Sequence, residues 1–146
     1  MISFAELFTR VLVILQCEEP LVYIMHSEIS QLLLTIVNSF RKTECVLAHK
    51  ITDGLLDDAS KYLPLDNIEC GTGVREAMSA ASVSPVDVAT FVVKARSAYI
   101  ASAKHIIDKV QLTSSGLLKP LTCLQPGNRT KTSSRDYIAK LCDALP

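Results

Sequence analysis

Apolar side chains recur three and four positions apart along most of this chain, which is the spacing that gathers them on one face of an α-helix. The first such stretch covers positions 3–16, and its apolar residues are Phe4, Leu7, Phe8, Val11, Leu12 and Leu15. A break at Cys17–Pro20 precedes a second stripe, formed by Leu21, Met25, Ile29, Leu32, Ile36 and Phe40 and widened by Ile24, Leu33 and Val37. Both stretches are therefore predicted to be helices that turn one face to a core. The second helix should begin at Pro20, which suits a first helical turn.

The longest helix is expected over residues 84–111. Ser84 is a favourable N-cap, Pro85 suits the first helical position, and the carboxylate of Asp87 can reach back towards the open amides. A helix of about 28 residues is roughly 42 Å long. Its core-facing strip should consist of Val88, Phe91, Val92, Ala95, Tyr99, Ile106 and Val110. This helix is predicted to be the spine against which the two N-terminal helices pack.

The middle of the chain is predicted to hold shorter elements. Residues 43–50 are read as a short helix, 61–68 as an extended loop, and 74–81 as a helix with a small-residue start. Asp57 and Asp58 are read as a solvated acidic turn, because nothing nearby supplies the further oxygen ligands that a hard cation needs.

The C-terminal part combines turns with a final helix. Pro120 should keep the leucine-rich piece around it short or kinked. Residues 125–132 hold turn residues and no apolar side chain, which predicts an exposed loop. Ser133 and Asp136 resemble a capping box that starts the last helix. The apolar side of this helix should be Ile138, Leu141, Cys142 and Leu145. The whole pattern predicts an all-α fold, an irregular bundle of about five to seven helices around one long helix at about residues 84–111.

Composition agrees with a globular chain that has a sizeable core. The 146 residues are 49% apolar and 21% charged, and a single helical domain over residues 1–146 is expected. The N-terminal stretch has no basic residues before its apolar run and no small-residue cleavage site after it, so it does not fit a signal peptide. Ile29–Phe40 is the longest charge-free run of the second stripe, and its 12 residues are too few to span a bilayer core of about 30 Å. No membrane partner is expected.

The formal net charge is zero, but its distribution is uneven. Residues 1–70 hold five basic and ten acidic side chains, whereas residues 71–146 hold ten basic and five acidic ones, which gives −5 and +5. The two halves could attract each other, the charges could simply be solvated, or the basic half could form a nucleic-acid face. In the last case Arg129, Lys131 and Arg135 would bind phosphate beside the open amides at the start of the final helix. The alternative is a solvated linker.

The reactive side chains form no recognisable catalytic or metal motif. The cysteines at 17, 45, 70, 123 and 142 are odd in number and lack C-x-x-C spacing, which predicts reduced, buried thiols in an intracellular chain. The histidines at 26, 49 and 105 could meet only through the fold, and His26 should be half-exposed on a helix flank. Gly71 and Gly73 lack the further residues of a phosphate loop. We expect no enzymatic activity, no cofactor, no metal and no small-molecule substrate.

Several short segments stand in a set order along most of the chain. An apolar helix precedes Cys17-Glu-Glu-Pro-Leu-Val-Tyr-Ile-Met-His26, and a long helix ends in Phe40-Arg-Lys. Leu63-Pro-Leu-Asp-Asn-Ile and Cys70-Gly71 follow, then a long helix with an aromatic residue, then Leu118-Lys-Pro-Leu-Thr-Cys-Leu-Gln-Pro126. In this order and spacing, the segments resemble the helical insertion region of hAT-type transposases and their host-domesticated descendants.

The resemblance implies that the chain is a fragment of a larger transposase-like protein. In that family the insertion region interrupts a ribonuclease-H-like core with three acidic residues, a zinc-binding DNA module usually precedes it, and a dimerisation segment follows. No pattern of these parts is visible here, so no catalytic acid is carried over. Family insertion regions help to shape the path of transposon DNA and the oligomer. The resemblance therefore supports Arg129, Lys131, Arg135 and Lys140 as nucleic-acid-binding residues, and it implies a nuclear location.

Two functions from different classes are predicted. The first is a non-catalytic helical interaction module derived from a hAT-type transposase, which acts through protein–protein contacts with other chains or with itself. The alternative is a nucleic-acid-binding segment that uses the basic C-terminal half to contact DNA weakly. Titration of duplex DNA at two salt concentrations would separate them, because phosphate contacts weaken steeply with salt.

Overall fold

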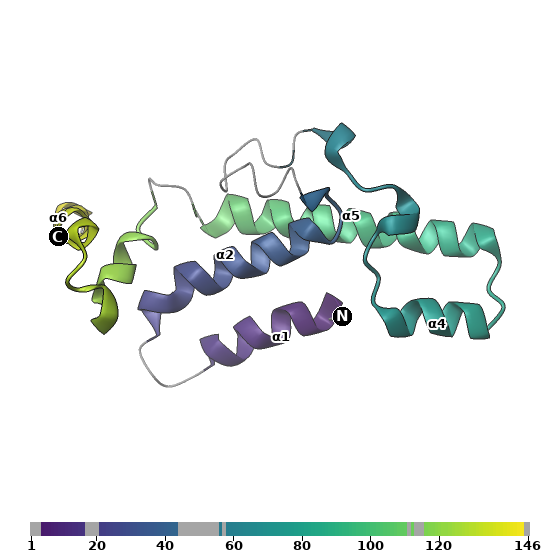
Figure 1. The fold of residues 1–146 in the computed structure, drawn as a ribbon, viewed down its shortest axis with the longest axis horizontal. Helices are drawn as coiled ribbons and strands as arrows, with labels where there is room; N and C mark the ends of the chain where they lie inside the picture. Colours follow the sequence, from purple (N-terminus) through teal and green to yellow (C-terminus); the bar gives the residue numbers. More distant parts are fainter. Residues whose placement is uncertain are drawn as a thin grey trace.

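The helices of the chain pack in an all-α arrangement (Figure 1). The structure is a computed structural model that describes residues 4–16, 21–43, 56, 58–110, 112 and 116–144. Within these ranges the α-helices are α1 (Phe4–Leu15), α2 (Val22–Asn38), α4 (Thr72–Ala80), α5 (Pro85–Val110) and α6 (Thr132–Ala144). Short 3₁₀ turns are η1 (Ala59–Lys61), η2 (Leu65–Asn67), η3 (Pro120–Leu124) and η4 (Pro126–Asn128). The predicted all-α fold around one long helix is confirmed.

The core lies where α1, α2 and α5 from Val92 onwards pack side by side (Figure 1). The predicted stripe of α2 supplies much of it, since Ile29, Leu32, Leu33, Ile36 and Val37 are all buried. From α5 come Val92, Tyr99, Ala103 and Ile106, and from α1 come Leu7 and Val11. At the surface, Arg10 of α1 and Glu28 of α2 form an ion pair at 3.2 Å. Burial of these matched stripes fixes the relative positions of the three helices.

α5 begins as its sequence predicts. The backbone N–H of Asp87 donates to Ser84 Oγ at 3.2 Å, and the Ser84 hydroxyl donates to Asp87 Oδ2 at 2.7 Å. This pair resembles a capping box with Asp in place of Glu, although the carboxylate accepts from the Ser84 hydroxyl and not from its backbone N–H. It satisfies an amide that the helix itself leaves open. The helix is 26 residues long, or about 39 Å.

The segment before α4 wraps the C-terminal end of α2. The N–H of Leu63 donates to Phe40 O at 2.8 Å, the N–H of Glu69 donates to Ser39 O at 3.1 Å, and the ring of Tyr62 packs edge-on against Phe40. At its start, hydrogen bonds from Ser60 and from Lys61 lower the pKa of Asp58 to about 2. The predicted extended loop thus starts at the last residue of η1 and contains η2, and it carries residues 68–71 to the side of α5.

The C-terminal helix differs from its prediction in two respects. α6 begins at Thr132, so Ser133 lies inside the first turn, and the buried Ser134 donates its hydroxyl to Asn128 O at 2.5 Å. Only Leu141 of the predicted apolar side is buried, whereas Ile138 and Cys142 are exposed. The reason is that α6 packs chiefly on the short η3, which covers a narrow part of the helix. The prediction for Leu145 lies outside the described residues.

Three further predictions concern the helix at 43–50, the exposed loop at 125–132 and the absence of a membrane-spanning helix. The predicted helix at 43–50 falls almost wholly outside the described residues, as do Cys17, Pro20, Cys45 and Asp57. Residues 125–132 are exposed except for the half-buried Asn128, although η4 gives this loop a turn of its own. Across the described part of the chain, no helix combines the length and apolar character needed to cross a membrane.

Candidate functional site

The N-terminal half of α5 is less buried than its second half. Buried residues of α5 begin at Val92, and α4, which runs alongside this half, has no fully buried residue among those described (Figure 1). The two helices make few close backbone contacts with each other. Space therefore remains between them, and apolar side chains of both helices line it.

This space is an apolar groove of about 540 Å³, here called the α4/α5 groove. Its walls come from four segments: Ala5 of α1, Cys70 of the preceding loop, Val74 of α4, and Phe91, Lys94, Ala95, Ala98 and Tyr99 of α5. Lys94 carries the one charge among these residues. A cavity of this size with apolar walls and a single cation at its edge is the type of site that binds an apolar group carrying a negative charge.

Phe91 in this groove overturns a prediction. The helical pattern placed it on the core-facing strip, yet its side chain is 38% exposed. Helical periodicity places Phe91 on the α4 side of α5, and α4 does not approach closely enough to cover it. The ring therefore forms part of the groove wall rather than part of the core.

The floor of the groove is rigidly held. Tyr99 is only 3% exposed, and its hydroxyl donates to Glu69 O at 2.7 Å. Arg75 of α4 donates from Nη2 to Asp66 O at 3.0 Å and to Ile68 O at 2.6 Å. These bonds join α4 and α5 to the same loop. The loop then turns into α4 at Gly71, whose φ of +83° favours glycine.

The polar groups of the groove are poorly suited to proton transfer or to nucleophilic attack. Burial is the main cause that raises the pKa of the Cys70 thiol, so the thiol stays protonated at neutral pH and is a weak nucleophile. Burial likewise raises the pKa of Tyr99, whose hydroxyl already donates to a carbonyl. Within the described ranges, no three His, Cys, Asp or Glu side chains gather in a way that could hold a metal ion. The groove therefore presents a mainly apolar surface.

The four basic residues predicted to contact nucleic acid are all exposed. Of these, Lys131 lines a small polar pocket of about 200 Å³ at the start of α6, together with Thr122, Asn128, Ser133, Ser134 and Tyr137. Arg129 lies just before this pocket, and Arg135 lies in the first turn of α6. Arg135 and Lys140 are about 140° apart around the helix and do not share a face. The structure therefore brings Arg129, Lys131 and Arg135 to one end of α6 and leaves Lys140 apart.

His26 has the half-exposed position on a helix flank that the sequence predicts. Burial lowers the pKa of its imidazole, as does the nearby charge of Lys119, although a hydrogen bond with the Leu112 backbone acts in the opposite direction. The imidazole is thus neutral at pH 7.

The α4/α5 groove was not predicted from the sequence. Its wall residues are small or apolar and come from segments far apart in the chain, so no local motif marks it. The helical pattern gave no signal for it, because Phe91, Ala95 and Tyr99 belong to the strip that was predicted to face the core. The pattern does not show that part of this strip lies beside α4.

Comparison with protein-family models, with curated proteins and with solved structures finds no match to this chain. The resemblance to the hAT insertion region therefore stays a prediction from the order of its segments.

Proposed function

We propose that this chain is a non-catalytic helical interaction module, and that its α4/α5 groove binds an apolar segment of a partner protein. The observation that carries the proposal is the groove itself, with the exposed Phe91 and Ala98 and the half-buried Ala95 along one side of α5. An amphipathic helix is the partner that suits it, because such a helix presents apolar anchors at a three- and four-residue spacing to a groove. An acidic residue beside those anchors would meet Lys94.

Peptide selection tests this function. A displayed library of amphipathic helices is selected on the whole folded chain, and enriched peptides should share apolar anchors at i, i+3 or i+4, and i+7 with a flanking Asp or Glu. Ala98→Glu should lower peptide affinity at least about 10-fold, because it places a carboxylate among apolar walls. Ala101→Glu, at an exposed position of the same helix outside the groove, is the matched control and should leave affinity unchanged. Failure to enrich any peptide, or equal effects of the two variants, would contradict the proposal.

A transposase origin is consistent with this function. An insertion region separated from its catalytic core would retain its capacity for protein contacts, and such a module would act in the nucleus. This origin and location rest on the resemblance in segment order alone.

Nucleic-acid binding is the second candidate, and a specific observation favours it. Lys131 lines a polar pocket at the N-terminal end of α6, and Arg129 and Arg135 are exposed beside it. The open amides of the first helical turn add positive potential there. If about four phosphates are contacted, affinity for duplex DNA should fall about 10²-fold for a fourfold rise in salt.

Replacement of Arg129, Lys131 and Arg135 with Ser separates this candidate from a solvated loop. DNA affinity should fall while the melting temperature holds, because all three side chains are exposed. Absence of DNA binding by the parent chain at low salt would remove the candidate and leave the protein-interaction module.

A further inference from the structure

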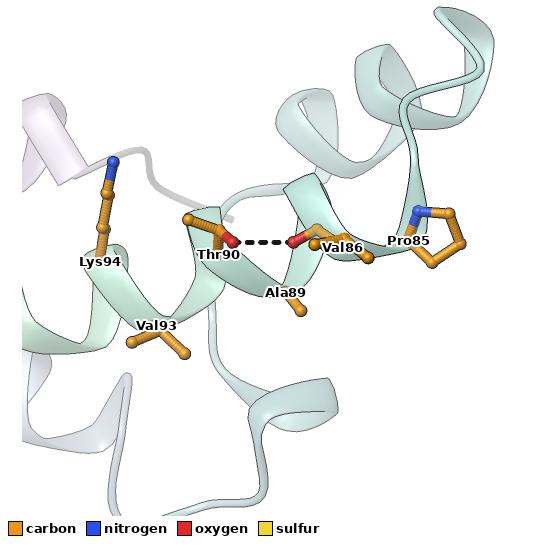
Figure 2. A pocket seen from close by; sticks show the side chains of 6 residues that line it. All are labelled: Pro85, Val86, Ala89, Thr90, Val93 and Lys94. Atoms are coloured by element: carbon orange, nitrogen blue, oxygen red, sulfur yellow. Dashed lines mark hydrogen bonds between the residues drawn. The ribbon is translucent and has the colours of Figure 1, made fainter.

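A second apolar face lies on the opposite side of Lys94 from the α4/α5 groove. Its residues Pro85, Val86, Ala89, Thr90, Val93 and Lys94 form an open, nearly flat patch on the first turns of α5 (Figure 2). Val86 is 74% exposed and Val93 is 40% exposed, although both are large apolar side chains. No described part of the chain covers this face.

The polar atoms of this face are satisfied within the helix. The Thr90 hydroxyl donates to Val86 O at 2.8 Å, a bond drawn in Figure 2, and the Ser97 hydroxyl donates to Val93 O at 3.0 Å. Both residues can therefore be buried against another surface without leaving an unpaired hydroxyl hydrogen. Val86, Thr90, Val93 and Ser97 follow one another at alternating spacings of four, three and four residues, which is the spacing of a helix–helix seam.

Two opposite charges lie along one edge of this seam. Asp87 and Lys94 each follow a valine of the seam. They are seven positions apart, which is nearly two full turns, so both project from the same edge. In a helix pair these are flanking positions whose charges set the orientation of the partner. In an antiparallel pair related by a twofold axis, Asp87 of each copy faces Lys94 of the other, which gives two opposite-charge contacts. A parallel pair makes neither contact.

We infer that this face of α5 binds the same face of a second copy of the chain in an antiparallel, twofold-symmetric dimer. The seam is self-complementary, as such an interface requires, because each copy supplies both the acid and the base. The formal net charge of zero means that two copies have no overall repulsion to overcome at neutral pH. This surface shares only Lys94 with the α4/α5 groove, and the inference does not depend on the function proposed for that groove.

The dimer should be weak. The seam from Val86 to Ser97 covers 12 residues, or about 18 Å of helix, and small side chains line it. Such an overlap falls in the class of transient interfaces that bury less than about 1,200 Å². Sedimentation velocity on the full chain should therefore run from about 10 µM to about 1 mM, where weak association is populated.

Charge exchange between variants tests the antiparallel arrangement directly. Asp87→Lys should abolish dimer formation because it faces Lys94 of the second copy, and Lys94→Asp should do so because it faces Asp87. An equimolar mixture of the two variants should again form dimers, since each contact then joins opposite charges. Circular dichroism melting should confirm that each variant is folded. Restoration in the mixture cannot come from a folding defect in either variant.

A second pair of variants locates the interface. Val86→Arg should raise the dissociation constant at least about 10-fold, whereas Val13→Arg on α1, where the parent valine is 62% exposed, should leave it unchanged. The inference is overturned if the parent chain stays monomeric at about 1 mM, if the mixture associates no better than its components, or if Val13→Arg has the larger effect. Val86 does not line the α4/α5 groove, so this result is independent of peptide binding there.

Discussion

At the scale of single residues, the buried polar contacts decide which positions tolerate change. Tyr99 is the clearest case, because its ring is buried in the core while its hydroxyl reaches the Glu69 carbonyl at 2.7 Å. Phe91, eight residues earlier on the same helix, is partly exposed and is not among the buried core residues. The two aromatic residues of one predicted strip should therefore contribute differently to the free energy of unfolding.

Tyr99→Phe should lower the free energy of unfolding by about 1 kcal/mol, because it leaves the half-buried Glu69 carbonyl without that donor. Phe91→Ala should cost less than the roughly 3–5 kcal/mol of a core phenylalanine, since the ring forms a groove wall. Denaturant titration of both variants measures the two costs. A full core cost for Phe91→Ala would show that the groove is closed in solution.

His26 should make stability depend on pH. Its pKa is lowered in the folded chain mainly by burial, so between the folded value and the unfolded value of 6.5 the unfolded chain binds more protons. Stability therefore rises with pH through this window and falls on acidification below about pH 7. His26→Gln should flatten this dependence in thermal melts between about pH 5 and 7.5. A slope that is unchanged in the variant would contradict the assignment.

At the scale of elements, α5 depends on its first turn because that turn extends beyond the core. Residues 85–91 have little burial to hold them in helical form, and Val88 is their one half-buried member. The capping box between Ser84 and Asp87 therefore stabilises the part of α5 that carries both apolar faces.

Ser84→Ala should lower stability by about 1 kcal/mol, because it removes the cap of the Asp87 amide. Ser97→Ala is the matched control in the interior of the same helix. There the hydroxyl only returns to a carbonyl already in the helix ladder, and alanine is the better helix former, so stability should hold or rise slightly. Equal losses for the two variants would show that the cap does not form.

The sequence predicts elements better than their contacts. Periodicity and cap chemistry predicted α1, α2 and α5 closely, because apolar spacing and the Ser84–Asp87 pair are local properties of the chain. The exposure of the basic residues around the start of α6 was also predicted from a local property, because residues 125–132 hold turn residues and no apolar side chain. The position of α4 relative to α5 was not, since it depends on the bonds of Arg75 and Tyr99 to the loop before α4. The burial of Arg41, which is 1% exposed with Nε and Nη1 unpaired, was likewise not predicted.

At the scale of the whole molecule, a packed part and a projecting part differ in how far their apolar side chains are buried. The packed part joins α1, α2 and α5 from Val92 onwards, and its apolar stripes are largely buried. The projecting part, made by α4 and the first half of α5, keeps apolar side chains exposed on two sides of Lys94. Uncovered apolar faces on an extended helix are what the interaction module proposed above would require.

The most direct test of this account is the tryptophan emission of a Phe91→Trp variant. The chain contains no tryptophan, so the emission reports on the α4/α5 groove alone. In the free protein the emission should be that of a partly hydrated indole. Saturation with a peptide selected on the parent chain should move it to shorter wavelength as the groove becomes dry. The same peptide should cause no shift when Ala98→Glu is added to this variant. An emission that does not move at saturation, or that moves equally with Ala98→Glu present, would contradict the groove as the binding site.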